Sequence, residues 1–317
     1  MGCRVLRRII LDTDVGLDVD DAYAISLAAR SPDLSLEGVT TVYGDTQLRA
    51  RVAVKLLKLA GGGNVPVLAG EGEPITKDRQ ALMLGFEGEG ILTPEDRKVR
   101  VSGGAVDFIT SKALASERNL TIVAIGALTN VAKAIEREPG ITDCVEELVV
   151  MGGVINPPEI EEKKVPFEYE YNFNCDPEAT RIVFESGVPI TLVPVDVTMK
   201  PENHLTENEL ERLREADTPL TRTLLEMTRV WLKHYGELAP ILGLTPGMVR
   251  PWMHDPLTVT VTLRKEIFKI EKLNLRIDTA DGNAKVVPDK NGVEVRVCTD
   301  ADFQRFKNLL IERLTKK

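Results

Sequence analysis

Short, continuous apolar runs alternate with amphipathic stretches along the N-terminal part of the chain. The apolar runs predict strands at residues 9–11, 36–42, 65–69, 120–125, 145–151 and 190–195. Stretches with helical spacing predict helices at 20–30, 48–59, 105–116, 130–138 and from 176 onward. Strands that are apolar throughout, with helices between them, are typical of a parallel sheet covered on both faces. We therefore predict an α/β fold with a single open, mostly parallel sheet flanked by helices.

The remaining segments depart from this alternation. Residues 70–104 contain many glycines and acidic side chains and few apolar runs, which predicts a mobile loop of the kind that often forms a lid. Residues 201–250 are mostly helical, with amphipathic helices at 207–216 and 219–235. Residues 269–277 and 292–298 predict a small antiparallel C-terminal piece, followed by a helix at 301–314. Without repeats or low-complexity linkers, we predict one domain over residues 1–317.

Composition narrows the range of partners. The chain has 40 Lys and Arg against 49 Asp and Glu, a net charge of −9, which argues against nucleic acid as a partner. It lacks the roughly 18 consecutive apolar residues of a membrane span and the apolar core of a signal peptide, so we expect a cytoplasmic protein without a membrane partner. The four cysteines are scattered, which predicts reduced thiols; they are Cys3, Cys144, Cys175 and Cys298.

Five aspartates lie within the ten residues 12–21, directly after the first predicted strand. They are Asp12, Asp14, Asp18, Asp20 and Asp21. Close carboxylates with little solvent around them repel one another strongly unless positive charge lies among them. Oxygen ligands suit Ca²⁺ and Mg²⁺ better than softer metals. The stretch therefore predicts a site for a hard cation.

Other acidic residues also follow predicted strands. Asp45 comes after the second strand and Asp196 after the sixth. Because ligands of parallel sheets bind outside the carboxyl ends of the strands, we expect these carboxylates to converge on one edge of the sheet. Asp255, directly after His254, would join them from the later segment.

Two generic interpretations of the aspartate-rich stretch fit poorly. An EF-hand loop needs glycine at its sixth position, where this chain has Leu17, and a helix rather than a strand before it. A phosphotransferase of the haloacid dehalogenase type would account for Asp12 and Asp14 directly after a strand. That superfamily does not ordinarily continue with a helix that opens in Asp20-Asp21-Ala22.

Residues 12–22 resemble the N-terminal signature of the nucleoside N-ribohydrolase family, the inosine-uridine preferring type. Five later stretches look like further motifs of that family in the family's order: Thr40-Thr41-Val42-Tyr43-Gly44, Gly126-Ala127-Leu128-Thr129-Asn130, Val149-Val150-Met151-Gly152-Gly153, Glu170-Tyr171-Asn172 with Asp176-Pro177-Glu178-Ala179, and His254-Asp255-Pro256. The resemblance extends from residue 9 to residue 257. It implies the nucleoside hydrolase fold and Ca²⁺-dependent cleavage of ribonucleosides into ribose and a free purine or pyrimidine base.

The resemblance also implies roles for particular residues. Asp14, Asp21, Asp255 and the backbone carbonyl of Ile125 would hold the Ca²⁺ ion, which leaves room for a water and the ribose hydroxyls. Asp14 would act as the general base on the attacking water. His254 would face the leaving base as proton donor or as part of the binding wall. The residues that would hold the ribose are Asp20, Asp45, Glu170 and Asn172.

The chain departs from the family pattern in four places. Two more residues than in the shorter family pattern separate Gly16 from Asp20-Asp21. If the extra residues are aligned at another point, Asp18 rather than Asp20 would contact the ribose. Asp45 stands where asparagine is common, Phe86 where many relatives have a loop histidine, and Lys164 at the spacing of an upstream asparagine.

Three aromatic side chains of the helical segment, Trp231, His234 and Tyr235, have two open interpretations: they roof the base pocket or they simply pack in the helix core. We expect a ribonucleoside as the small-molecule partner and a homo-oligomer, a dimer or tetramer, as in relatives. The alternative function is a nucleoside- or sugar-binding protein that has kept the fold but lost catalysis.

Overall fold

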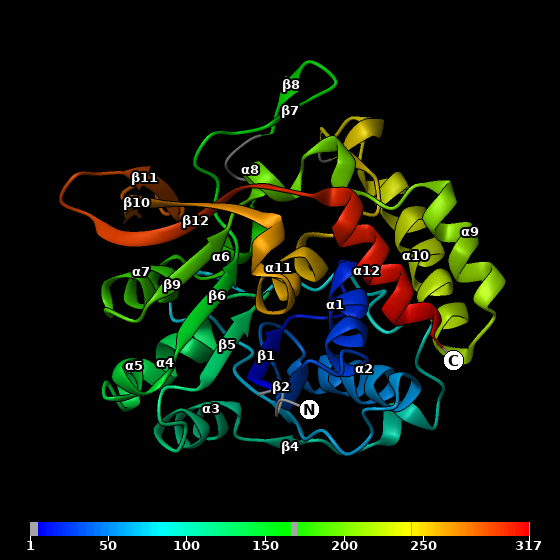
Figure 1. Cartoon of the computed structure of the whole chain (residues 1–317), viewed down its shortest axis with the longest axis horizontal. Helices are drawn as coiled ribbons and strands as arrows, with labels where there is room; N and C mark the ends of the chain where they lie inside the picture. The colour runs from blue at the N-terminus through cyan, green and yellow to red at the C-terminus, as the bar shows by residue number, and fades with distance from the viewer. Residues whose placement is uncertain (1–5, 166–169, 242, 317) are drawn as a thin grey trace.

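The computed structural model describes residues 6–165, 170–241 and 243–316 of the chain. Its centre is a ten-stranded sheet with the strand order β11-β10-β12-β9-β6-β5-β1-β2-β3-β4 (Figure 1). The strands of this sheet are β1 Arg7–Thr13, β2 Leu34–Thr41, β3 Val67–Ala69, β4 Ser102–Gly103, β5 Leu120–Ala124, β6 Glu147–Met151, β9 Ile190–Val193, β10 Phe268–Asp278, β11 Lys285–Pro288 and β12 Val293–Ala301. A separate two-stranded hairpin is formed by β7 Glu159–Ile160 and β8 Lys163–Lys164.

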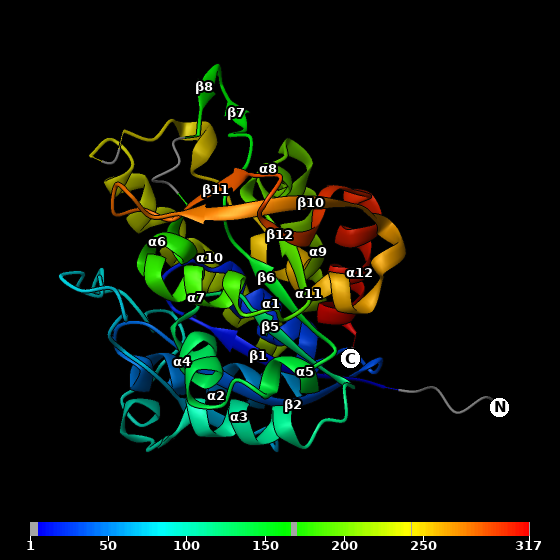
Figure 2. The same ribbon diagram turned by 90° about the vertical axis from the view of Figure 1, so that its left-hand side faces the viewer.

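Helices follow most of the strands in the chain. They are α1 Asp20–Ala29, α2 Thr46–Ala60, α3 Ala105–Leu114, α4 Thr129–Arg137, α5 Ile141–Cys144, α6 Tyr171–Cys175, α7 Pro177–Glu185, α8 Val195–Thr198, α9 Glu207–Ala216, α10 Pro219–Leu238, α11 His254–Leu263 and α12 Phe303–Thr315. Figure 2 shows the same ribbon from the side, with helices on both sides of the sheet.

The predicted parallel sheet is confirmed, because the strands from β4 to β9 pair in parallel across the sheet. The antiparallel C-terminal strands are also confirmed: β10 pairs antiparallel with both β11 and β12. These strands extend the main sheet, since β12 pairs in parallel with β9 through Arg296 opposite Thr191 and Val297 opposite Leu192.

Alternation along the strands divides the core between the two faces of the sheet. Ile9 and Leu11 of β1 belong to the hydrophobic cluster that includes residues of α1, α2, α10, α11 and α12. Ile10 belongs to a second cluster with residues of α3, α4 and α7. A strand buried on both faces needs apolar side chains at consecutive positions, which is the pattern of residues 9–11.

The irregular segments agree in part with the sequence. Within residues 70–104 the structure has only the short strand β4 and the 3-10 turn Asp96–Lys98, so this segment is a long loop; its mobility stays a prediction. The hairpin of β7 and β8 and the short helices α5, α6 and α8 were not predicted. Cys144, Cys175 and Cys298 are free thiols, and Cys3 lies outside the described residues. No helix in the described part of the chain is long and apolar enough to cross a membrane.

Candidate active site

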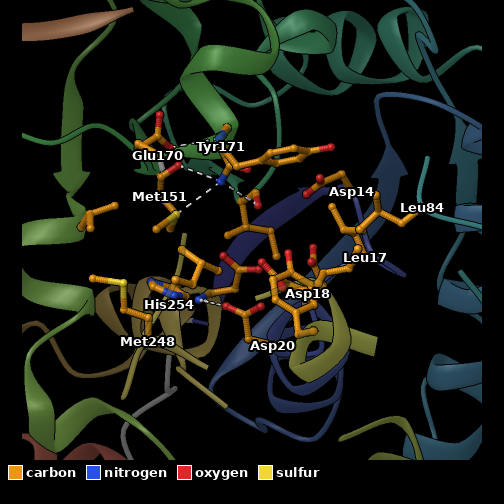
Figure 3. Close-up of a pocket in the computed structure, with 18 of the residues that line it drawn as sticks. Asp14, Leu17, Asp18, Asp20, Leu84, Met151, Glu170, Tyr171, Met248 and His254 are labelled. Carbon is orange, nitrogen blue, oxygen red and sulfur yellow. Dashed lines mark hydrogen bonds between the residues drawn. The ribbon is translucent and has the colours of Figure 1, made fainter. Parts of the chain in front are cut away.

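A cavity of about 480 Å³ opens at the carboxyl ends of the central strands, a volume within the range of small-molecule sites (Figure 3). Its charged lining is acidic apart from two lysines of β8, Lys163 and Lys164. The structure brings most of the predicted site residues to this cavity: Asp14, Asp20, Asp21, Ile125, Glu170, Asn172, His254 and Asp255.

Backbone and side-chain hydrogen bonds hold the turn after β1 in place. The backbone N–H of Val15 donates to the Thr13 hydroxyl oxygen at 3.1 Å, and this hydroxyl donates to the Asp21 carboxylate. The backbone N–H of Ile125 donates to the Asp12 carbonyl at 2.8 Å, which brings the end of β5 beside Asp14. A Cβ at Gly126 would lie 2.8 Å from Asp14 Oδ1, so only glycine permits this close approach.

Asp20, Asp21 and Asp255 form a buried group whose carboxylate oxygens come within 4.8 Å of one another. The backbone N–H of Asp255 donates to Asp20 Oδ2 at 3.1 Å. Asp20 begins α1 and Asp255 lies in the first turn of α11, so the amino ends of two helices meet at this group. Partial positive charge at these helix ends favours carboxylates there.

Burial controls the protonation of these aspartates. Burial raises the pKa of Asp14 to about 6, although the Arg49 guanidinium opposes the rise. Burial and the neighbouring carboxylates raise the pKa values of Asp20, Asp21 and Asp255 well above the ordinary range. A bound cation removes this repulsion, and the donors facing the cavity are oxygens, the ligands of hard divalent ions. The residues present therefore fit a metal ion.

Glu170 and Asn172 approach the same cavity from α6. Glu170 is the N-cap of this helix and accepts hydrogen bonds from the backbone N–H groups of Asn172 and Phe173, both at 3.0 Å. Burial raises the pKa of Glu170 to about 7. Asn172 Nδ2 donates to the Ile125 carbonyl at 3.2 Å and to the Met151 carbonyl at 3.3 Å, which joins the ends of β5 and β6. A carbonyl oxygen has two lone pairs, so Ile125 keeps one for another partner.

His254 lies at the wall of the cavity near Asp20 and Met248 (Figure 3). Its Nδ1 is 2.7 Å from the Thr198 hydroxyl oxygen, which fixes the plane of the ring. Burial lowers the pKa of His254 to about 4, so the imidazole is neutral near pH 7. With Nδ1 engaged, Nε2 is the ring nitrogen left for a substrate. Thr198 carried no signal in the sequence that linked it to His254.

Two of the predicted carboxylates lie elsewhere, which corrects the expectation of convergence. Asp45 is exposed and caps α2 by accepting from the Leu48 backbone N–H at 2.8 Å; it does not line the cavity. Asp196 accepts from the backbone N–H groups of Ile155 and Asn156 at 2.9 and 2.6 Å. Both carboxylates follow strands, but Asp45 bonds a backbone N–H three residues on, a common use of aspartate, whereas Asp196 holds the backbone of the distant loop at 155–156.

Asp12 holds the frame of the site from outside the cavity. Its Oδ1 accepts from the Thr40 hydroxyl at 2.5 Å and from Asn130 Nδ2 at 2.8 Å. These contacts join β1 to β2 and to α4, so Asp12 supports the site without lining the cavity.

Sequence reasoning missed the apolar part of the cavity lining. The missed residues come from the long loop and from residues 235–248, two regions far apart in the chain, and they are Leu82, Leu84, Leu238, Leu244 and Met248, with Tyr235 left open between two interpretations. Of the three aromatics with two open interpretations, Tyr235 lines the cavity, Trp231 is buried beside it, and His234 stacks on Phe86 with ring centroids 4.4 Å apart. The i, i+4 spacing of Trp231 and Tyr235 was the available signal. Lys164, at the spacing of the family's asparagine, also lines the cavity.

Comparison with known proteins gives consistent results. The model of the inosine-uridine preferring nucleoside hydrolase family matches residues 9–308. The chain is 31% identical to the inosine-uridine preferring nucleoside hydrolase of Crithidia fasciculata over 98% of both chains. It is 29% identical to a pyrimidine-specific ribonucleoside hydrolase of Salmonella paratyphi C, over 96% of this chain and 97% of the relative.

Solved structures agree with the sequence comparisons. The purine-preferring ribonucleoside hydrolase from Gardnerella vaginalis superposes with a TM-score of 0.82 and 30% identity, over 97% of this chain and 98% of the other. The family match covers nearly the whole chain, including every residue that lines the cavity. The chain therefore belongs to the inosine-uridine preferring nucleoside hydrolase family.

Proposed function

We propose that this protein is a Ca²⁺-dependent hydrolase that cleaves the N-glycosidic bond of ribonucleosides to ribose and a free purine or pyrimidine base. The observation that carries the proposal is one cavity in which Asp14 and the acidic group Asp20, Asp21 and Asp255 face Glu170. Family membership supports the reaction class. Because the relatives compared above differ in the base they prefer, the proposal leaves base preference open.

The ligands proposed for the ion are the carboxylates of Asp14, Asp21 and Asp255 and the carbonyl oxygen of Ile125. This set contains only oxygen, and Ca²⁺ accepts about six to eight oxygen ligands, so positions remain for sugar hydroxyls. When bound, Ca²⁺ supplies positive charge that orients those hydroxyls and favours loss of a proton from a nearby water. Asp20, which accepts a hydrogen bond from the Asp255 backbone N–H, is proposed to hold the ribose beside the ion ligands.

Asp14 is the proposed general base. Its carboxylate takes a proton from the water that attacks C1′ of the ribose. A C1′–O bond forms, the C1′–N bond breaks, and the bonding pair leaves with the base, which gains a proton. Asp14 suits this role because a bound cation keeps its carboxylate ionised, and only the ionised form can take the proton. The transition state has the oxocarbenium character common to glycoside hydrolysis.

His254 is proposed to meet the leaving base. A neutral imidazole gives a proton only from the nitrogen that carries one. For His254 to protonate the base, the Thr198 hydroxyl must donate to Nδ1 so that Nε2 carries the hydrogen. In the opposite tautomer Nε2 accepts a hydrogen bond from the base and His254 acts only in binding.

The sugar and the base would occupy different parts of the cavity. Asp20, Glu170 and Asn172 offer polar groups to the ribose, whereas Tyr235 and Met248 belong to the apolar lining suited to a planar base. Asp45 is left out of the ribose contacts because it caps α2 outside the cavity.

A reducing-sugar assay with inosine, uridine, cytidine and adenosine in the presence of Ca²⁺ tests the proposal. We expect ribose release from at least one of them and loss of release after chelation. If none is cleaved while one binds, the alternative of a nucleoside-binding protein without catalysis replaces the enzyme. We further propose that the protein is cytoplasmic and forms a homo-oligomer, a dimer or tetramer. Light scattering after size exclusion measures the number of subunits.

A further inference from the structure

Asp18 is the one aspartate of the loop after β1 whose side chain is tied to α10. Its Oδ1 accepts a hydrogen bond from Trp231 Nε1 at 2.7 Å, across a sequence separation of 213 residues. The Tyr235 side chain also hydrogen-bonds this carboxylate. Both donors come from α10, and their rings stack with centroids 4.7 Å apart. Asp18 and Tyr235 line the active-site cavity, while Trp231 lies behind them.

An apolar contact beside Asp18 also joins the loop after β1 to α10. Leu17 packs with Phe86 of the long loop and with Val230 of α10 in a small buried cluster. Figure 3 shows Asp18 beside Leu17, with Leu84 on the same side of the cavity. The loop after β1 therefore holds α10 by a polar contact through Asp18 and an apolar contact through Leu17.

Asp18 differs in this from Asp20, whose carboxylate lies beside two of the proposed ion ligands. Asp20 lies in the group with Asp21 and Asp255, whose oxygens come within 4.8 Å of one another, and Asp18 does not belong to that group. Because the ribose hydroxyls are proposed to meet the ion, Asp20 is a better candidate than Asp18 for the sugar contact.

We propose that Asp18 is a positioning residue, which acts through Trp231 and Tyr235 to hold the α10 wall against the base end of the cavity. The inference rests on the proposed nucleoside hydrolysis and assigns Asp18 to binding of the base. Hydrogen bonds to a carboxylate are roughly twice as strong as neutral ones, so the charge of Asp18 matters to the position of α10. Tyr235, held at its hydroxyl and stacked on Trp231, then presents a fixed surface to the base.

The test compares ligands with and without a base on three variants. Asp18→Asn keeps an oxygen that accepts from Trp231 but removes the charge, Asp18→Ala removes both, and Trp231→Phe removes the indole donor. Arg229→Gln is the matched control, because Arg229 lies on the exposed side of α10 and pairs with Glu226. For each variant we measure KM and kcat for the best nucleoside, the inhibition constant of free ribose, and the melting temperature.

We expect Trp231→Phe to raise KM by about tenfold, the effect of losing one hydrogen bond to a charged group, and Asp18→Ala, which also loses the Tyr235 contact, to raise it at least as much. Asp18→Asn should fall between them and the wild type, and Arg229→Gln should match the wild type. The ribose inhibition constant should stay within about twofold in every variant, because the proposed ribose site lies at the ion ligands and not at the α10 wall.

Three outcomes overturn the inference. A parallel weakening of ribose and nucleoside in Asp18→Asn would place Asp18 at the sugar. Loss of melting temperature with unchanged KM would make the contact a folding clamp alone. A large effect of Asp18→Ala without any effect of Trp231→Phe would mean that Asp18 does not act through Trp231. If the wild type cleaves no nucleoside, the proposed function fails, and the same ligand comparison by calorimetry still decides the role of Asp18.

Discussion

Thr13 offers a direct test of how the fold prepares the proposed metal site. The Thr13 hydroxyl is buried, accepts from the Val15 backbone N–H and donates to Asp21. Thr13→Val replaces the hydroxyl with a methyl group of similar shape, so the packing is kept while both hydrogen bonds are lost. Asp21 then loses the donor that fixes its carboxylate, and the Val15 N–H is left buried without its partner.

The expected effect on Ca²⁺ binding follows from what such contacts contribute elsewhere. Removing a hydrogen bond that orients a metal ligand weakens metal binding by about 10- to 100-fold. Leaving one buried donor unsatisfied costs about 1–3 kcal/mol of unfolding free energy. We therefore expect Thr13→Val to weaken Ca²⁺ binding by at least about tenfold and to lower stability by about 1–3 kcal/mol. Thr13→Ser, which keeps the hydroxyl, is the control.

Calorimetric titration of the chelated protein with Ca²⁺ measures the first quantity, and urea unfolding without the ion measures the second. The reasoning is refuted if Thr13→Val binds Ca²⁺ as tightly as Thr13→Ser, because Asp21 would then need no orientation by Thr13 or would not bind the ion.

Four further predictions concern separate parts of the molecule. Asp14→Asn should lower kcat by at least about 100-fold with little change in melting temperature; near-normal turnover would remove Asp14 as the base. His254→Ala should slow natural nucleosides more than a nitrophenyl riboside, and equal losses would argue against proton donation to the base. Asp45→Ala should cost about 1 kcal/mol of stability through loss of the α2 cap, whereas a large rise in KM would return Asp45 to the ribose site. Hydrogen bonds from Arg8 and Lys112 lower the pKa of Glu37 from 4.5 to about 2, so the stability that they contribute is present above pH 4.5 and is lost as the pH falls toward 2. The melting temperature of Glu37→Gln should therefore fall less between pH 4.5 and pH 2 than that of the wild type, and an equal fall in both would contradict this prediction.

The sequence contained most of the fold because its strands are buried on both faces. Consecutive apolar residues such as Ile9, Ile10 and Leu11 serve two different cores, and this local requirement is visible without the structure. The parallel pairing of the central strands, the antiparallel C-terminal strands and the free thiols of Cys144, Cys175 and Cys298 were also predicted from local patterns. The hairpin of β7 and β8 escaped prediction because two-residue strands carry no periodicity.

Some residues of the candidate site were predictable from the sequence, and others were not. Asp14, Asp21 and Asp255 were recognisable from motifs, and the structure brings their side chains to one cavity. Asp45 and Asp196 have the same residue type at the ends of strands, yet each bonds backbone donors nearby, and only three-dimensional geometry distinguishes the two uses. The partner of Asp18 lies 213 residues away, so no local pattern could reveal it.

Restoration of ribose release by Ca²⁺ tests the central claim most directly. The protein is freed of divalent ions with a chelator, and ribose release from its best nucleoside is followed as Ca²⁺ is added back, with Asp255→Asn as the matched variant. We predict that the wild type is inactive after removal of divalent ions and that Ca²⁺ restores turnover with one bound ion per chain. Asp255→Asn should need far more Ca²⁺ for any recovery. Full activity of the wild type after removal of divalent ions would contradict Ca²⁺-dependent hydrolysis.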